Sequence, residues 1–128
     1  VELYHGGNVP IRDFIHMDYD NDILVAVHIK KTPLKVTYLS QRNTATDFPV
    51  LAVAVSEYED KLHVSIGARP VKADVLTVDL SEKADMDQLV KKVTESFSFG
   101  SNRRAGADYR RHLSGILFKR ACTANNDN

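Results

Sequence analysis

The sequence predicts an α+β fold in which a mainly antiparallel sheet is covered on one face by C-terminal helices. Segments that alternate apolar and polar residues, as β-strands do, fill most of residues 23–80. Segments with apolar residues every three or four positions, as in helices, follow from residue 85 onward. Strands that come first and helices that come last favour an α+β sandwich over an alternating α/β architecture.

Five segments are expected to be strands. Residues 49–59 begin as a nearly continuous apolar run, which is typical of a strand in the middle of a sheet. Glu59 and Asp60 form a tight connection to the next segment, so these two strands are predicted to be a hairpin. The five segments are residues 23–30, 34–41, 49–59, 61–68 and 75–80.

Two helices are expected after the strands. In the first, Asp85 and Gln88 form a capping box at the start, and Gly100 ends the helix. The second is amphipathic and is expected over residues 105–121. Its apolar stripe comprises Tyr109, Leu113, Ile116, Leu117 and Ala121. Residues 123–128 are polar and are expected to fray.

Composition is that of an ordinary single domain. With 43% hydrophobic and 27% charged residues, the chain is expected to form one domain over residues 1–128. Seventeen basic residues balance seventeen acidic ones, so neither nucleic acid nor an anionic membrane surface is an expected partner. The longest apolar run, residues 49–55, is far shorter than the ~18 residues of a membrane span.

The start of the chain and its single cysteine bear on processing and on the redox environment. The chain begins at Val1 without an initiator methionine or a signal-type apolar segment, so we expect a processed or excised piece. The segment that follows is expected to be irregular, with a short helical turn around residues 12–15. Cys122 is the one cysteine, which excludes an internal disulfide and fits a reducing cytoplasm. We expect it to be a small packing residue rather than a reactive thiol.

Motifs for catalysis and metal binding are missing from the sequence. There is no glycine-rich dinucleotide fingerprint, phosphate-binding loop or nucleophile motif, and the five histidines lack metal-ligand spacing. Asp18, Asp20 and Asp22 alternate as in a calcium-binding loop. Such a loop then needs a glycine and a carboxylate where this chain has Ile23 and Ile29. We therefore expect no metal site and no catalysis by this chain on its own.

Three segments resemble parts of one protein family and occur in the same order. They are RNTATDFPVLAVAVS at residues 42–56, IGARP at residues 66–70 and GSNRRAGADYRRHLSGILFKRAC at residues 100–122. The family is the flavoprotein subunit of the molybdenum hydroxylases, which includes xanthine dehydrogenase and the molybdenum type of carbon monoxide dehydrogenase. The chain resembles the C-terminal domain of that subunit, from about Ile11 to Cys122.

This resemblance implies a part in an FAD-dependent oxidoreductase. In the family, electrons pass from a molybdenum centre through iron–sulfur clusters to FAD and then to an acceptor. Two N-terminal lobes hold the ADP and pyrophosphate of FAD, and the domain that this chain resembles closes over the isoalloxazine ring. The expected partners are those lobes, which this chain lacks, and the iron–sulfur and molybdenum subunits or domains. The isolated domain is expected to bind FAD weakly or not at all, and to self-associate through an apolar patch left exposed.

The expected flavin contacts lie in the loop of residues 42–48. The resemblance places Asp47 and Phe48 against the isoalloxazine ring, and an apolar wall with a charge nearby suits a flavin. The residues alone leave a second interpretation open, in which Asp47 merely starts the strand together with Pro49.

Three further positions belong to the expected cofactor site, namely Arg42, Asn43 and Leu39. Leu39 stands where the family often has a lysine, which weakens any cationic role there. Asn43 stands where some members have an arginine, which weakens the case for a pyridine nucleotide as the electron acceptor.

Four arginines near the second helix allow a different function. The helix macrodipole disfavours cations at a helix start, so their placement needs an explanation. Docking of an acidic partner or a phosphate is one explanation, and a solvated face is the other. The four are Arg103, Arg104, Arg110 and Arg111, and in the family an acidic residue stands at the position of Asn102. The alternative function is a cofactor-free interaction module that uses this basic cluster.

Overall fold

The computed structural model describes residues 1–18, 21–80 and 85–126. These residues form two antiparallel sheets and three helices, which confirms the α+β class. Where the sequence predicts one domain, the chain divides into two compact units, Val1–Pro33 and Leu34–Asn128.

The first unit is a small sheet with one short helix. Its strands β1 (Glu2–Leu3), β2 (Gly7–Asn8) and β3 (Leu24–Ala26) lie in the order β2-β1-β3, and α1 (Ile11–Phe14) lies near the expected helical turn. The strand predicted over residues 23–30 is therefore too long. An alternating pattern does not set the length of a strand, and β3 pairs with β1, which has only two residues to offer.

Asp22 braces the loops of this first unit. Its carboxylate accepts hydrogen bonds from the backbone N–H groups of His5 at 2.9 Å and Gly6 at 2.7 Å. These bonds, with that to His5 the largest cause, lower the pKa of Asp22. Of the three aspartates in the calcium-like sequence, Asp22 thus accepts hydrogen bonds from the backbone of its own unit. Asp20 lies outside the described residues.

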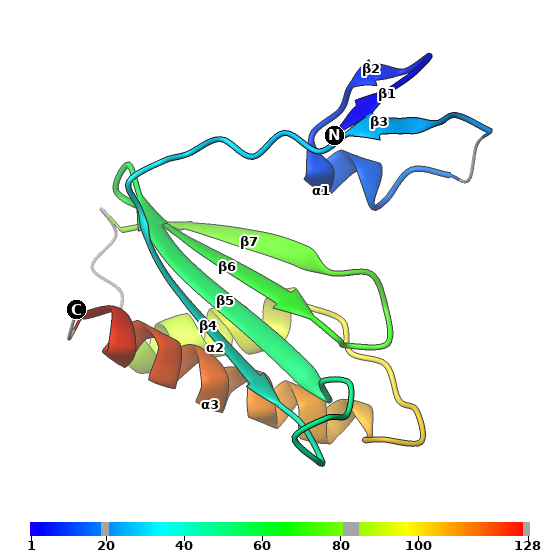
Figure 1. Ribbon diagram of the computed structural model, residues 1–128. Helices are drawn as coiled ribbons and strands as arrows, with labels where there is room; N and C mark the ends of the chain where they lie inside the picture. The colour runs from blue at the N-terminus through cyan, green and yellow to red at the C-terminus, as the bar shows by residue number, and fades with distance from the viewer. Residues whose placement is uncertain (19–20, 81–84, 127–128) are drawn as a thin grey trace. The chain divides into compact units, whose positions relative to one another are not determined.

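The second unit holds a four-stranded antiparallel sheet in the order β4-β5-β6-β7 (Figure 1). The strands are β4 (Lys35–Gln41), β5 (Leu51–Tyr58), β6 (Lys61–Gly67) and β7 (Asp74–Asp79). β5 is an inner strand, as its apolar run predicts. The β5–β6 hairpin is also confirmed, and it turns through Glu59 and Asp60 with φ values of 51° and 57°.

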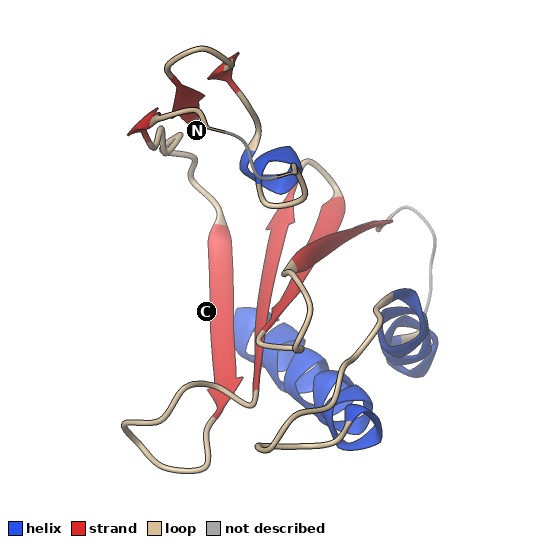
Figure 2. Ribbon diagram, turned by 90° about the vertical axis from the view of Figure 1, so that its right-hand side faces the viewer, coloured by secondary structure: helices blue, strands red, loops and turns tan. Residues whose placement is uncertain are grey.

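Two helices, α2 (Met86–Ser96) and α3 (Ala107–Asn126), cover one face of this sheet (Figure 2). The capping box of α2 is confirmed, since the Asp85 carboxylate accepts a hydrogen bond from the backbone N–H of Gln88 at 2.8 Å. The core lies between the sheet and the helices. The residues buried there include Leu51, Val53, Val55, Leu62, Val64, Ile66, Val93, Phe97, Leu113, Leu117 and Phe118.

The buried face of α3 does not begin at Tyr109, as the predicted stripe does. Leu113, Leu117 and Ala121 are buried as predicted, but Tyr109 is 52% exposed and Arg110 takes the inward position in the first turn. The predicted stripe starts at Tyr109 because arginine is mostly a surface residue, although a long side chain can be buried where its donors find acceptors.

The end of α3 continues through the segment that was expected to fray. The helix reaches Asn126, and Asn125 is buried. Thr37 of β4 donates a hydrogen bond through Oγ1 to the Asn125 side-chain oxygen at 2.6 Å. A tertiary contact therefore stabilises a polar segment whose local sequence favours fraying, and residues 127–128 of that segment lie outside the described residues.

Gly115 lets α3 approach α2 closely. A Cβ atom at this position would lie 3.0 Å from Val90 Cγ1 and 3.2 Å from Thr94 Cγ2. Glycine inside a helix costs about 1 kcal/mol relative to alanine, so its presence at this contact needs a packing reason. The close approach of the two helices supplies that reason.

Candidate functional site

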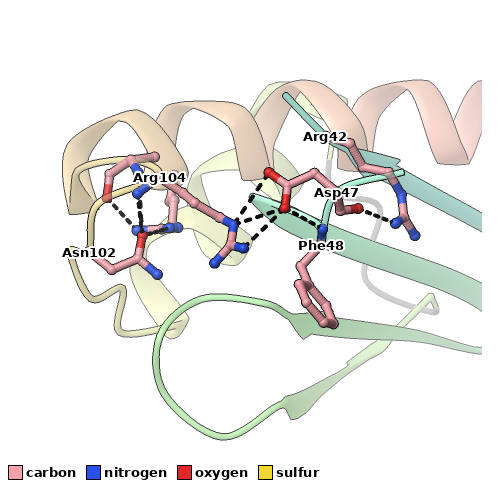
Figure 3. A network of polar contacts seen from close by, with 7 residues as sticks. Arg42, Asp47, Phe48, Asn102 and Arg104 are labelled. Atoms are coloured by element: carbon pink, nitrogen blue, oxygen red, sulfur yellow. Dashed lines mark hydrogen bonds and ion pairs between the residues drawn. The ribbon is translucent and has the colours of Figure 1, made fainter. Parts of the chain in front are cut away.

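Two loops meet at one end of the four-stranded sheet. The loop of residues 42–50 joins β4 to β5, and the loop of residues 97–106 joins α2 to α3. Arg104 of the second loop contacts Asp47 of the first, although 57 positions separate them in the sequence (Figure 3). We call this place the Asp47 corner, which comprises Arg42, Asp47, Phe48, Asn102 and Arg104.

The Asp47 carboxylate is held from two sides. The Arg104 guanidinium donates through Nη2 to Oδ1 at 3.0 Å, and its Nε lies 3.4 Å from both carboxylate oxygens. The backbone N–H of Phe48 donates to Oδ1 at 2.7 Å. These contacts, with the Arg104 hydrogen bond the largest cause, lower the pKa of Asp47. Asp47 therefore carries a fixed negative charge at neutral pH, paired with the positive charge of Arg104.

Arg42 also contacts Asp47, but through the backbone. Its Nη1 donates to the Asp47 carbonyl oxygen at 2.5 Å. This bond closes the β4–β5 loop across five positions and leaves the carboxylate to Arg104. Arg42 therefore holds the backbone of the loop, and Arg104 holds the Asp47 side chain.

The Phe48 ring is an exposed apolar surface beside this carboxylate. The residue is 74% exposed, and the Arg104 guanidinium carbon lies 5.5 Å from the centroid of its ring. One exposed aromatic residue is common on protein surfaces. A ring next to a fixed carboxylate and a guanidinium is more specific, because a flat apolar molecule could stack on it with a charge alongside.

The structure brings three of the five predicted site residues into one contact network. They are Arg42, Asp47 and Phe48. Asn43 is exposed in the same loop. Leu39 is placed elsewhere, since it pairs with Val53 in the sheet and packs against the helix-covered core.

Arg110, in the first turn of α3, is buried and bonds both loops, so a solvated face is the wrong description for it. The residue is 1% exposed. It donates to the carbonyl oxygens of Val50 at 2.9 Å, Gly100 at 2.8 Å and Ala105 at 2.5 Å, and to the Asn102 side-chain oxygen at 2.7 Å. Burial, with a smaller contribution from the Arg104 charge, lowers the pKa of Arg110. Arg110 therefore connects the loop of residues 42–50 to the loop of residues 97–106.

Another arginine of the basic cluster is also engaged within the chain. Arg111 donates to the Thr94 carbonyl oxygen at 2.8 Å and lies 5.4 Å from the centroid of the Phe99 ring. Arg103 is exposed. Since Arg104, Arg110 and Arg111 all bind the chain itself, the cluster offers an external partner less free charge than its sequence suggests.

Sequence reasoning missed the contact between Arg104 and Asp47 and the role of Asn102 beneath it. The one available signal was the placement of arginines at a helix start, where the macrodipole disfavours them. That signal indicates that the cations have partners, but it does not say which residues those partners are.

Arg69, in the turn after β6, points into the protein. The residue is 4% exposed, and its Nη1 donates to the Ser98 carbonyl oxygen at 2.6 Å. Gly100 lies against this turn, since a Cβ atom on it would be 3.2 Å from Pro70 Cβ. These contacts hold Arg69 and the turn against the loop of residues 97–106.

A concave surface lies between α2 and α3, apart from the Asp47 corner. It is an open groove of about 500 Å³, with Val90, Gly115 and Ile116 among its lining residues. Charges on its rim are partly paired, as Lys119 Nζ lies 3.5 Å from the Asp87 carboxylate. Gly115 adds no side chain to this groove, and its described lining residues include no exposed phenylalanine ring like that of Phe48.

No protein-family model matches the chain, and no curated protein matches it either. In the described ranges, histidine, cysteine, aspartate and glutamate side chains do not gather in threes that could hold a metal ion. Of the helices described, not one combines the length and apolar character that a bilayer span needs.

Proposed function

We propose that this chain is the C-terminal domain of the FAD-binding part of a xanthine dehydrogenase-like molybdenum hydroxylase, where it closes over the isoalloxazine ring. Three segments that resemble the family in the right order support the proposal. The single observation that carries it is the Asp47 corner, where the 74% exposed Phe48 ring lies beside a carboxylate fixed by Arg104.

The residues of this corner fit the needs of a flavin. A flavin ring needs an apolar wall, and charges near its edges tune its reactivity. Phe48 offers the wall, and Asp47 offers a charge whose position is fixed before any ligand arrives. When bound, FAD would supply the electron-transfer chemistry, while this chain would exclude water from one side of the ring and set the charge next to it.

We expect the corner to contribute little affinity for whole FAD. One ring face and one carboxylate bury a small area, and the ADP and pyrophosphate of FAD would be held by the other lobes. The chain alone should therefore bind FAD weakly. Tight, stoichiometric FAD binding by the chain of residues 1–128 would show that it is more than a lid.

Titration of the chain with lumiflavin, the isoalloxazine ring without its tail, tests the proposal directly. We expect backbone amide NMR shifts at millimolar lumiflavin to be concentrated in residues 42–48 and around Arg104. Phe48→Ala should remove most of these shifts, because the variant lacks the ring on which lumiflavin stacks.

A matched variant keeps this test specific. Tyr109→Ala removes another exposed ring, 52% exposed, in the first turn of α3. It should leave the lumiflavin shifts unchanged. Shifts that lie elsewhere on the chain, or an equal loss in both variants, would overturn the proposal.

A further inference from the structure

We infer that Arg104 is the positioning residue of the Asp47 corner, because its guanidinium fixes the Asp47 carboxylate and occupies one side of Phe48, so that a flavin ring meets the opposite side. This inference rests on the proposed function and adds a residue that acts through Asp47 and Phe48. The contact spans 57 positions of sequence and joins two loops.

The geometry favours Arg104 over Arg42 for this role. Arg104 has donors within 3.4 Å of both carboxylate oxygens, whereas Arg42 bonds to the backbone oxygen of Asp47. A guanidinium is a planar fork of donors that can bond a carboxylate and stack on a ring at once. Arg104 uses both properties, since its guanidinium carbon is also 5.5 Å from the Phe48 centroid.

Arg104 reaches the corner from a firmly held turn. The Asn102 side-chain oxygen accepts from the Arg104 backbone N–H at 2.9 Å and from Arg110 Nη2 at 2.7 Å. The Asn102 backbone N–H donates to the Ala105 carbonyl oxygen at 3.1 Å. The buried Arg110 thus supports Asn102, and Asn102 supports the backbone from which Arg104 extends. A site needs such a supporting layer to hold a side chain in one geometry.

Removal of Arg104 should loosen the corner without unfolding the protein. The Arg104 side chain is 40% exposed, and the side chains that fill the core are untouched by its loss. Asp47 would lose its charged partner and Phe48 its stacked neighbour. The ring would then sample more orientations and stack less well on a flat ligand.

The experiment compares Arg104→Gln with Arg103→Gln, the adjacent exposed arginine, in the chain of residues 1–128. The first readout is ligand-free, namely the titration of the Asp47 carboxyl carbon and the amide relaxation of residues 47–48. Only Arg104→Gln should raise the pKa of Asp47 toward its ordinary value and increase fast motion at these amides.

The second readout is lumiflavin binding. Arg104→Gln should weaken the lumiflavin response roughly two- to fivefold, the range for one partly exposed charge contact. Arg104→Lys should bring the pKa of Asp47 part of the way back to its wild-type value. It should restore less of the lumiflavin binding, because an ammonium lacks the planar fork of a guanidinium. A purely structural role for Arg104 would not separate these two readouts.

The two readouts distinguish failure of the inference from failure of the proposed function. Equal Asp47 titration and relaxation in Arg104→Gln and Arg103→Gln would overturn the inference and leave the flavin proposal standing. If lumiflavin causes no shifts at the corner of the wild-type chain, the flavin proposal is overturned, and with it the role of Arg104 toward a flavin.

Discussion

Arg110 Nε donates a hydrogen bond to the carbonyl oxygen of Val50 at 2.9 Å, across 60 positions of sequence. This bond connects the first turn of α3 to the last residue before β5, and it is buried. The same guanidinium bonds Gly100, Ala105 and Asn102, so one side chain determines how the two loops of the corner lie against each other.

Arg110→Ala should destabilise the second unit by about 3 kcal/mol or more, since it leaves several carbonyl oxygens without donors in a buried place. Chemical denaturation followed by circular dichroism measures the loss. Arg103→Ala is the matched control and should stay within about 0.5 kcal/mol of the wild type. A loss below about 1 kcal/mol for Arg110→Ala would contradict the role of this side chain.

Asn102→Asp should stabilise the protein at neutral pH. The neutral Asn102 oxygen accepts from the charged Arg110 Nη2 at 2.7 Å, and a carboxylate there would add the attraction between two opposite charges to this bond. The gain should disappear as the pH falls below about 4, where the new carboxyl takes up a proton. Thermal unfolding at pH 7 and pH 3 measures it, and an unchanged midpoint at pH 7 would argue against a direct charge effect.

Asp47 should make the stability of the second unit depend on pH in the acid range. Its pKa is lowered in the folded chain, so its contribution is present above the ordinary value of 3.8 and is lost as the pH falls through the folded value. Unfolding measured from pH 7 to pH 2 should show a smaller acid dependence for Asp47→Asn. Arg104→Gln should reduce it similarly, and parallel curves for all three proteins would contradict the assignment.

Cys122 should react slowly with thiol reagents in the folded protein. Burial, with a smaller contribution from the Glu57 charge, raises the pKa of its thiol to about 11. At pH 8 the thiolate fraction should be roughly a hundredfold lower than that of an ordinary cysteine. The rate of reaction with a disulfide reagent, measured with and without denaturant, checks this, and equal rates would show that the thiol is accessible.

Gly115→Val should weaken the docking of α2 on α3 by about 2 kcal/mol, because a side chain at this position would overlap Val90 and Thr94. Gly106→Val is the control, since nothing lies within 4 Å of the added Cβ there. Denaturant midpoints of the two variants give the comparison. Equal midpoints would show that the helices can separate at little cost.

The sheet and the helix starts could be predicted because their signals are local. Alternation between residues 34 and 80 marks β4 to β7, and Asp85 with Gln88 marks the start of α2. The length of β3 could not be predicted, because it depends on a partner strand far away in the sequence. The helical end of α3 was missed for a similar reason, since the contact between Thr37 and Asn125 spans 88 positions.

The corner was predicted only in part. The β4–β5 loop, with Asp47 and Phe48, could be proposed from its residues and its resemblance to a family. The roles of Arg104 and Arg110 could not, because charge patterns do not say whether an arginine lies in solvent or under a loop. Their roles depend on two loops meeting in space, which a sequence read along its length does not reveal.

Arg110 donates its hydrogen bonds to neutral oxygens, so no carboxylate of the described residues neutralises its positive charge directly. Arg104 bonds the Asp47 carboxylate, Arg42 bonds the Asp47 backbone, and Arg110 bonds the same turn through Asn102. These three guanidinium groups outnumber the one carboxylate among them, so their summed local field is positive although Asp47 itself is negative. A molecule that gains negative charge when it accepts electrons is favoured more after reduction than before. For the proposed flavin, this neighbourhood would shift the reduction potential upward.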